Sequence, residues 1–232
     1  MGSISPSPSL PYWQVNIPPS ERTAQCPPFL LNLTPKDIGI ISSPDSHFTR
    51  DTWPEARQKV LTNRIDLFQR SPSELRLYHA FTWQLKQDYG SVLSFILSQR
   101  LHWSDPVVPR GKRPFEDEGD LKVLWNDWPY GIDERIVHLV VWTKFELDED
   151  ERTGDLTDEA RAMVDSYVKR VFGEVEEERV IWFKNWRYLK SVKAVEHFHV
   201  MLFGPDMDFV RRVTNGDVPA FMREAGVDPY AK

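Results

Sequence analysis

The stretch from residue 121 to residue 203 constrains the fold more than any other part of the chain. It opens with residues 121–131, and short runs rich in Val, Ile, Trp and Phe follow at residues 136–144, 180–186 and 194–203. A helical pattern lies between residues 144 and 180. Runs of this length and composition, bounded by Gly, Pro or acidic loops, are typical of buried strands. The order strand, strand, helix, strand, strand predicts an α+β domain with an antiparallel sheet.

The helix expected between the second and third strands has clear signals at both ends. Thr157 is a good N-cap residue, and Gly173 belongs to the type that commonly follows the last turn of a helix. Between them, apolar residues form a stripe at helical spacing, at Ala160, Met163, Val164, Tyr167, Val168, Val171 and Phe172. We expect this helix to pack across one face of the sheet.

Residues 29–103 predict a helical layer that precedes the sheet. Ser71, Pro72 and Glu74 have the spacing of a capping box with proline in the first helical turn. Another helix is expected from about Pro54, where proline again suits the first turn.

The remaining segments set the domain boundaries. Residues 1–28 are rich in Ser and Pro and predict a disordered tail, so that residues 29–232 form a single domain. Residues 104–120 contain three prolines beside a basic and an acidic cluster, which predicts a long loop. Two short helical segments are expected after Gly204, the second ending at Gly226.

Composition narrows the class of protein and the compartment. The net charge of −6 argues against non-specific nucleic-acid binding by the whole surface, so we expect no DNA partner. No apolar run approaches the roughly 20 residues that span a bilayer, and we expect no membrane partner. A single cysteine, Cys26, excludes an internal disulfide framework and fits a reducing compartment, which predicts a cytoplasmic location.

Several ordered segments between about residues 30 and 203 resemble a known family. They are Lys86-Gln-Asp-Tyr-Gly-Ser91, Arg100-Leu-His-Trp103, Asn126-Asp-Trp-Pro-Tyr-Gly131, His138-Leu-Val-Val-Trp142, Trp182-Phe-Lys-Asn-Trp186 and Ser191-Val-Lys-Ala-Val-Glu-His-Phe-His-Val200. These motifs are similar to those of the fungal N-acetylglucosamine-induced protein family, long classed as a domain of unknown function. The resemblance implies kinship with the fungal arginine-containing cyclodipeptide synthases, which join arginine and a second amino acid, both delivered on tRNA, into a diketopiperazine of secondary metabolism.

The chain departs from those synthases in one motif. Their activity is associated with an Asp-Asp-Xaa-Xaa-Glu sequence, and the nearest segment here, Asp133-Glu-Arg-Ile-Val137, has Glu in the second place and Val in the last. This departure favours an alternative class, a non-catalytic small-ligand-binding or regulatory protein induced by amino-sugar metabolism.

A more distant similarity concerns the fold. An Asn126-Asp-Trp segment before a strand, then a helix, then His197-Phe-His199 resembles the order of landmarks in histidine-triad proteins. The resemblance implies a histidine-triad-like sheet in which His197 takes the nucleophile's position and Val195 replaces the first histidine. Nucleotide hydrolysis or transfer would follow from this likeness alone.

Two pairs of residues are candidate catalytic groups. Asp133 and Glu134 follow a predicted turn, where a carboxylate could bind an arginyl guanidinium or accept the proton of an attacking amine; the alternative is a pair of solvated turn acids. His197 and His199 alternate along a strand and therefore face the same side, as an acid–base pair or as satisfied core histidines. No third ligand stands at metal-binding spacing, so no metal is predicted. We expect His138 to be structural.

Further residues are predicted to bind substrate and tRNA. Asn126, Asp127, Trp128, Trp186 and Glu196, the last on the strand face opposite the histidines, are candidate substrate-binding residues; for the first two the alternative is an Asx turn. The basic residues interleaved with aromatic ones, or in the long loop, are candidates for holding an aminoacyl-tRNA end, with ordinary solvated cations as the alternative. They are Arg110, Lys112, Arg113, Lys184, Arg187, Lys190 and Lys193.

The sequence therefore favours an enzyme, a tRNA-dependent arginine-containing cyclodipeptide synthase whose partners are arginyl-tRNA and a second aminoacyl-tRNA. Because the aminoacyl esters arrive activated, the protein needs to orient two of them and move protons. No cofactor is expected, since no ATP-binding loop or metal motif is required.

Overall fold

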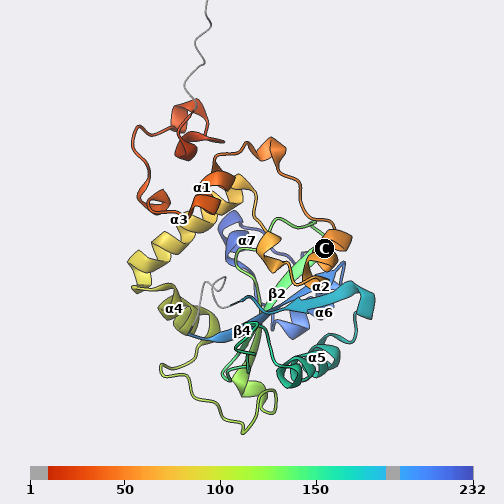
Figure 1. Ribbon diagram of the computed structural model, residues 1–232. Helices are drawn as coiled ribbons and strands as arrows, with labels where there is room; N and C mark the ends of the chain where they lie inside the picture. Colours follow the sequence, from red (N-terminus) through yellow and green to blue (C-terminus); the bar gives the residue numbers. More distant parts are fainter. Residues whose placement is uncertain (1–9, 187–193, 232) are drawn as a thin grey trace, which may run out of the picture.

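The computed structural model describes residues 10–186 and 194–231, and a four-stranded antiparallel sheet lies at its centre (Figure 1). The strands are β1 (Leu121–Trp125), β2 (Ile136–Thr143), β3 (Val180–Phe183) and β4 (Glu196–Phe203), in the order β1-β2-β4-β3. The predicted α+β class with an antiparallel sheet is confirmed. The third strand is shorter than its apolar run, because the ladder with β4 ends at the pair Phe183 and His199.

Helices precede, interrupt and follow this sheet. The α-helices are α1 (Pro35–Ile41), α2 (Trp53–Leu61), α3 (Pro72–Tyr89), α4 (Val92–Phe95), α5 (Asp158–Phe172), α6 (Met207–Val213) and α7 (Ala220–Ala225), and a π-helical segment, η6 (Ile96–Leu101), continues α4. Short 3₁₀ segments are η1 (Tyr12–Gln14), η2 (Pro19–Glu21), η3 (Pro28–Leu30), η4 (Asp45–His47), η5 (Ile65–Leu67), η7 (Glu118–Asp120) and η8 (Glu177–Arg179).

The helix starts follow the predicted capping chemistry. Ser71 accepts a hydrogen bond from the backbone N–H of Glu74 at 3.2 Å, and the Glu74 carboxylate accepts one from the N–H of Ser71 at 3.1 Å. Thr157 caps α5 in the same way through the N–H of Ala160. The capping box and the N-cap that the sequence predicts are therefore present.

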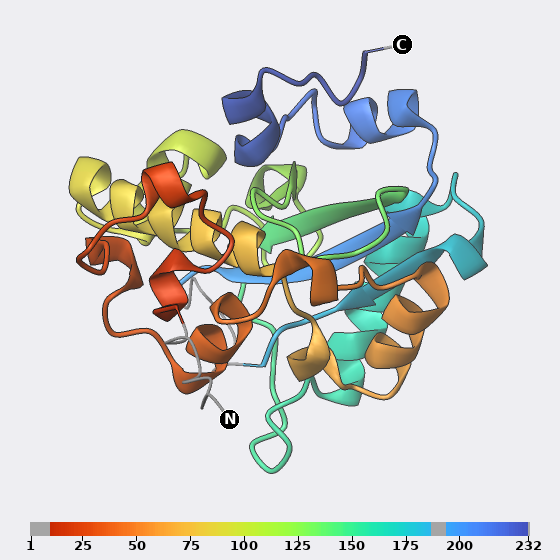
Figure 2. The ribbon, with the colours of Figure 1, turned by 90° about the horizontal axis from the view of Figure 1, so that it is seen from above.

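Helices α5 and α6 cover one face of the sheet, as expected for α5. The alternate residues Val137, Leu139 and Val141 of β2 point to this face and pack with Val164 and Phe172 of α5. Figure 2 shows α5 against the sheet on the side away from α3 and α4. This is the larger of the two apolar layers, and its residues are almost fully buried.

The opposite face is covered by the N-terminal helices. Leu85 of α3 and Phe95 of α4 pack with Val140 and Trp142 of β2, while Trp53 of α2 belongs to the cluster over the β3 side of the same face. The helical layer predicted for residues 29–103 thus lies on the sheet face that carries the histidines, and it leaves the cavity described below.

Residues 10–28 differ from the disordered tail expected of a Ser- and Pro-rich stretch. The Tyr12 hydroxyl donates to the carbonyl of Leu30 at 2.8 Å, and the Arg76 guanidinium donates to the carbonyl of Trp13 at 2.8 Å. Both aromatic rings pack against the cluster around Leu30, because an aromatic side chain between prolines can still bury its ring on a neighbouring helix. Residues 1–9 lie outside the described part of the chain.

Replacement of Leu139 by alanine should destabilise the domain by about 2–5 kcal/mol, because the side chain is fully buried in the middle of β2 and its loss leaves a cavity under α5. The free energy of unfolding is measured by urea denaturation. The matched control is Leu61→Ala, at a side chain that is 71% exposed, for which a change within about 0.5 kcal/mol is expected. Equal losses in the two variants would contradict this account of the core.

Candidate functional site

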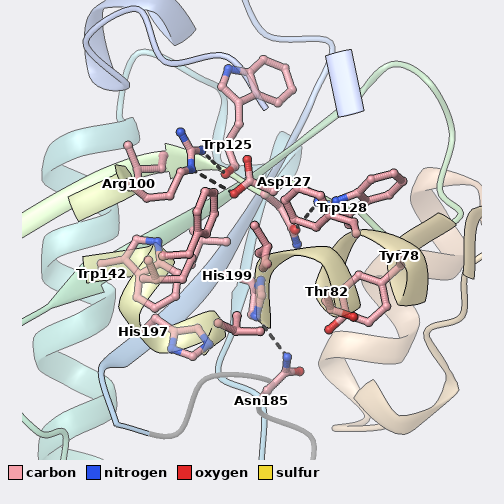
Figure 3. Close-up of a pocket in the computed structure, with 18 of the residues that line it drawn as sticks. Tyr78, Thr82, Arg100, Trp125, Asp127, Trp128, Trp142, Asn185, His197 and His199 are labelled. Atoms are coloured by element: carbon pink, nitrogen blue, oxygen red, sulfur yellow. Dashed lines mark hydrogen bonds and ion pairs between the residues drawn. The ribbon is translucent and has the colours of Figure 1, made fainter. Parts of the chain in front are cut away.

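A cavity of about 140 Å³ lies between the sheet and the segment from α3 to η6. We call it the histidine cavity. Figure 3 shows His197, His199 and Asn185 toward one end of it and the Arg100–Asp127 pair toward the other. Apolar side chains of α3, α4 and the strands line it, and its polar groups include those of the two histidines of β4, of the segment after β1, and of Asn185 and Arg100.

Strand register brings two histidines of different strands into contact at the edge of this cavity, which His199 lines. His138 on β2 pairs with Met201 in the ladder and His199 on β4 pairs with Val140, so the two imidazoles are diagonal neighbours on one face. Their Nε2 and Nδ1 atoms are 3.0 Å apart. The amide nitrogen of Asn185 lies 3.0 Å from Nε2 of His199 and donates to the hydroxyl oxygen of Tyr130 at 3.3 Å.

This hydrogen-bonded chain orders the protons on the imidazoles. With the Asn185 amide nitrogen donating to Nε2, His199 carries its own proton on Nδ1 and donates it to Nε2 of His138. Burial, with the positive charge of Arg70 nearby, lowers the pKa of His138 to about 3. His138 is therefore a neutral acceptor that fixes the orientation of His199.

His197 occupies the same face two residues earlier. Its Nδ1 lies 2.9 Å from the carbonyl oxygen of Val195, which places the proton of the neutral ring on Nδ1 and makes Nε2 the basic nitrogen. The ring packs on Trp142, with centroids 4.5 Å apart, and its centroid is 5.7 Å from that of His199. The expectation that His197 and His199 share one face is met by this geometry.

A buried charge cluster closes the other end of the cavity. The Arg100 guanidinium, 6% exposed, donates to the Asp127 carboxylate at 2.9 Å and to both oxygens of Asp217 at 2.5 and 2.9 Å. Asp217 also accepts from the N–H of Trp125, and Asp127 accepts from the N–H of Ala220. The cluster ties η6 to the end of β1 and to the segment before α7.

The surroundings of Asp127 bear on its predicted role in substrate binding. Burial raises the pKa of this carboxyl, while Arg100 opposes the rise. Both carboxylate oxygens are already engaged, one by Arg100 and one by Ala220. The neighbouring Asn126 accepts from the N–H of Trp128 at 3.0 Å, which is the Asx turn that the sequence left open, and its amide lies 3.3 Å from Nε2 of His138.

A second, larger concavity of about 790 Å³ contains the two predicted catalytic acids. Four carboxylates line it, together with aromatic and methionine side chains; we call it the acidic groove, and its acids are Glu74, Asp133, Glu134 and Glu224. Asp133 pairs with Arg135 at 2.6 Å, and this hydrogen bond lowers its pKa to about 2. Glu74 pairs with Arg50. Within residues 10–186 and 194–231, Glu134 and Glu224 form no ion pair.

The two pockets share a wall and contain one buried donor without an acceptor. Trp128 and Tyr130 line both pockets. His138 lines the acidic groove, and its ring contacts His199, which lines the histidine cavity. The indole Nε1 of Trp128, a residue only 8% exposed, has no hydrogen-bond acceptor among the residues that the structure describes. A buried donor of this kind is uncommon and is completed by a ligand or a water molecule in many proteins.

The structure does not bring the predicted acids and histidines into one pocket. Asp133 and Glu134 precede Ile136, which pairs with Phe203, whereas His199 and His197 pair with residues four and six positions further along β2. At about 3.3 Å per residue these separations amount to roughly 13 and 20 Å. The acids and the imidazoles therefore belong to adjoining pockets.

The other predicted residues lie in several places. Lys184, 8% exposed, is buried between Glu149 and Glu196, with its Nζ 3.4 Å from the latter, so it is not a surface cation as predicted. The two carboxylates offset the desolvation cost of the buried Lys184 ammonium, which would be larger without them. Glu196 thus lies away from the histidine cavity. Trp186 donates to Asn63 at 3.2 Å and lines neither pocket.

The remaining basic residues predicted to bind tRNA divide into two groups. Arg110, Lys112 and Arg113 are exposed on the loop before β1. Arg187, Lys190 and Lys193 fall within residues 187–193, outside the described part of the chain. Their predicted role stays a prediction.

Sequence reasoning missed three polar residues of this region. His138 is expected from the sequence to be structural, and neither Asn185 nor Arg100 is a candidate. Alternation along the strand places His138 on the same face as Val140, two residues later. Its contact with His199, the partner of Val140, depends on the register between β2 and β4. Pairing register over a separation of 61 residues is not visible in local periodicity.

The described residues offer neither a metal-binding cluster nor a membrane-spanning helix. No group of three or more His, Cys, Asp or Glu side chains in residues 10–186 and 194–231 is arranged to hold a metal ion. Across that same part of the chain, no helix has the length and apolar character that crossing a membrane requires.

The chain matches one protein family and is similar in sequence to two fungal proteins. Residues 52–203 match the model of a family described as a protein of unknown function (DUF3605). N-acetylglucosamine-induced protein 1 of Candida albicans is 25% identical over 185 residues, covering 71% of this chain and 73% of that protein. An uncharacterized protein of Saccharomyces cerevisiae is 26% identical over 159 residues, covering 66% and 79%.

One solved structure has the same fold over most of the chain. The crystal structure of HTC1 superposes with a TM-score of 0.55 at 23% identity, covering 78% of this chain and all 100% of that one. At this identity the match bears on the fold alone. The predicted kinship with the fungal N-acetylglucosamine-induced proteins is confirmed, whereas the triad role of His197 stays a prediction.

The low pKa of His138 makes stability depend on pH. In the unfolded chain this imidazole binds a proton below about pH 6.5, whereas in the folded protein it does so only near pH 3. Folding stability is therefore intact above pH 6.5 and is lost as the pH falls toward 3, by up to about 1.4 kcal/mol per pH unit from this group. Urea denaturation from pH 7 to pH 4.5 should show a shallower loss for His138→Gln than for the parent chain. Parallel profiles would show that His138 is not buried in its neutral form.

Replacement of Arg100 by methionine should cost about 3–5 kcal/mol of folding stability, because Asp127 and Asp217 would be left buried without their cation. The matched control is Arg152→Met. The Arg152 side chain is 87% exposed and pairs with Asp150, so its loss should change stability by less than about 1 kcal/mol. Thermal and urea unfolding measure both. A mild effect at Arg100 would contradict the role of the cluster in joining η6 to the C-terminal segment.

Proposed function

Given that the chain belongs to the DUF3605 family of proteins of unknown function, we propose that it is an enzyme, a tRNA-dependent synthase that joins arginine to a second amino acid as a cyclo-Arg-Xaa diketopiperazine. The α-amine of one aminoacyl ester attacks the carbonyl of the other, and the ribose oxygen of the tRNA leaves with the proton. The amine of the resulting dipeptidyl ester then attacks its own ester carbonyl, closes the ring and releases the second tRNA. Both steps need positioning and proton transfer.

The single observation that carries the proposal is that two chemically different pockets adjoin at Trp128 and Tyr130. A reaction between two amino acids needs two neighbouring sites. The acidic groove suits the arginyl residue, because Glu134 and Glu224 form no ion pair in the described chain and a guanidinium binds carboxylates through paired hydrogen bonds. The Trp128 indole N–H could donate to the carbonyl oxygen of the bound arginyl residue.

The histidine cavity suits the amine and the second side chain. Its volume of about 140 Å³ is below the roughly 300 Å³ of a typical small-molecule pocket, so it has room for a side chain rather than for a nucleotide. The side-chain oxygen of Asn185 is buried, without a hydrogen-bond donor among the described residues, and could accept from an α-amine.

Proton transfer falls to His197 in this proposal, and His199, whose two ring nitrogens are engaged by His138 and Asn185, lies beside it. The pKa of His138, about 3, is too far below neutrality for an efficient general base, so this residue orients His199 instead. His197, whose Nδ1 is directed at the Val195 carbonyl, presents Nε2 as the base. The absent Asp-Asp-Xaa-Xaa-Glu motif then matters less, since the acids serve to bind arginine.

The test is expression of the chain in a bacterial host, followed by mass spectrometry of the medium for arginine-containing diketopiperazines. We expect a cyclo-Arg-Xaa product that is absent from the empty-vector control. Glu134→Gln should lower its yield by about 10- to 100-fold, the loss expected when a charged hydrogen bond to the guanidinium is removed. Glu159→Gln, at an exposed position on α5, is the matched control and should leave the yield unchanged.

Two outcomes would contradict the proposal. Soluble, folded protein without any product would favour the alternative, a non-catalytic small-ligand-binding or regulatory protein induced by amino-sugar metabolism. A diketopiperazine without arginine, at a yield indifferent to Glu134→Gln, would remove the assignment of the acidic groove to arginine.

A further inference from the structure

A third concavity, of about 460 Å³, lies where η6 ends beside β1 and β2. Three cationic side chains line it, Arg110 from the loop, Lys122 from β1 and Lys144 just after β2, together with His102 and Trp103. We call it the basic groove. The nearby acid Asp120 serves backbone and lysine partners rather than the open space.

The charges of this groove do not cancel. Lys144 is paired with the buried Asp120 at 3.1 Å, and that carboxylate also accepts from the N–H groups of Arg110 and Gly111. Lys122 and the Arg110 guanidinium form no ion pair within residues 10–186 and 194–231. The Nζ of Lys122 donates to the carbonyl of Arg100 at a long 3.4 Å, and burial lowers the pKa of this half-buried ammonium. The charge of Asp217 opposes this lowering, but Asp217 is already paired with Arg100, so an anionic ligand would stabilise the Lys122 ammonium further.

An aromatic side chain stands among these cations. Trp103 is half-buried in the groove, and Nζ of Lys144 lies 5.4 Å from its ring centroid. Cations beside an indole are the combination that binds the phosphate and the base of single-stranded nucleic acid.

The position of the groove relates it to the other two pockets. Alternate residues of β2 and its extension face the same side, and they line the three concavities in order: His138 the acidic groove, Val140 and Trp142 the histidine cavity, and Lys144 the basic groove. Residues of η6 follow the same order of pockets, since Arg100 lines the histidine cavity and Leu101 lines the basic groove. The basic groove therefore follows the histidine cavity along β2.

We infer that the basic groove binds the terminal nucleotide of a single-stranded RNA end, with Lys122 and Arg110 on its phosphate and Trp103 against its base. This inference rests on the proposed function in taking a tRNA acceptor end as the occupant. A free nucleotide has the same chemistry at this point, and the experiment separates the two sources.

The test measures fluorescence anisotropy of a labelled RNA hairpin with a single-stranded CCA end, titrated with the full chain. Arg110→Gln, at an exposed loop residue, and Lys122→Gln should each weaken binding about fivefold or more, and each should reduce the slope of log affinity against log salt by about 0.7 for every phosphate that the variant no longer neutralises. Trp103→Leu should weaken it at least about fivefold, with little change in the salt slope. Lys169→Gln, on α5 at the opposite face of the sheet, is the matched control.

Three results would overturn the inference. Equal effects of Arg110→Gln and Lys169→Gln would show that the groove is not the site. Adenosine monophosphate competing as tightly as the RNA itself would assign the groove to a free nucleotide. Product formation that Lys122→Gln and Arg110→Gln leave unchanged would separate the groove from the synthase. RNA binding through the groove in a chain that makes no product would retain this inference and refute the proposed function.

Discussion

Burial of the sheet on both faces determines where polar side chains can stand in this fold. All 8 residues of β2 are buried, because α5 and α6 cover one face and the segment from α2 to η6 covers the other. A polar group at such a position must find a hydrogen-bond partner inside the protein. His138 and His199 meet this requirement through each other, and Asn185 completes the chain at the end of β3.

The two faces of the sheet differ in how apolar and polar side chains are packed. On the α5 face, nearly every inward residue is apolar, and the charged group of Lys184, Glu149 and Glu196 stands at its margin. On the opposite face the apolar packing is divided into two clusters, and the imidazoles occupy the space between them. Close packing is therefore complete on the face that stabilises the sheet and incomplete on the face that carries the polar cavity.

Local signals in the sequence were sufficient for the elements but not for the pockets. The capping box before α3, the stripe of α5 and the apolar runs depend on residues close together in the chain, so the main helices, the strands and the α+β class could be predicted. The common face of His197 and His199 also followed from alternation alone. The separation of Asp133 and Glu134 from these histidines could not be predicted in this way, because it depends on how β2 and β4 are aligned. Contacts between distant segments explain the other differences: Lys184 pairs with Glu149 across 35 residues, and the carboxylate partners of Arg100 lie 27 and 117 residues away.

The Arg100 cluster also constrains the order in which the chain can fold during synthesis. Asp217 and Ala220 leave the ribosome well after their partners, since Arg100 precedes Asp217 by 117 residues and Asp127 precedes Ala220 by 93. Until then, the guanidinium has a single carboxylate partner and remains accessible to water. We therefore expect a nascent chain to hold this end of the cavity open until the segment around Asp217 and Ala220 has emerged and closed over β1.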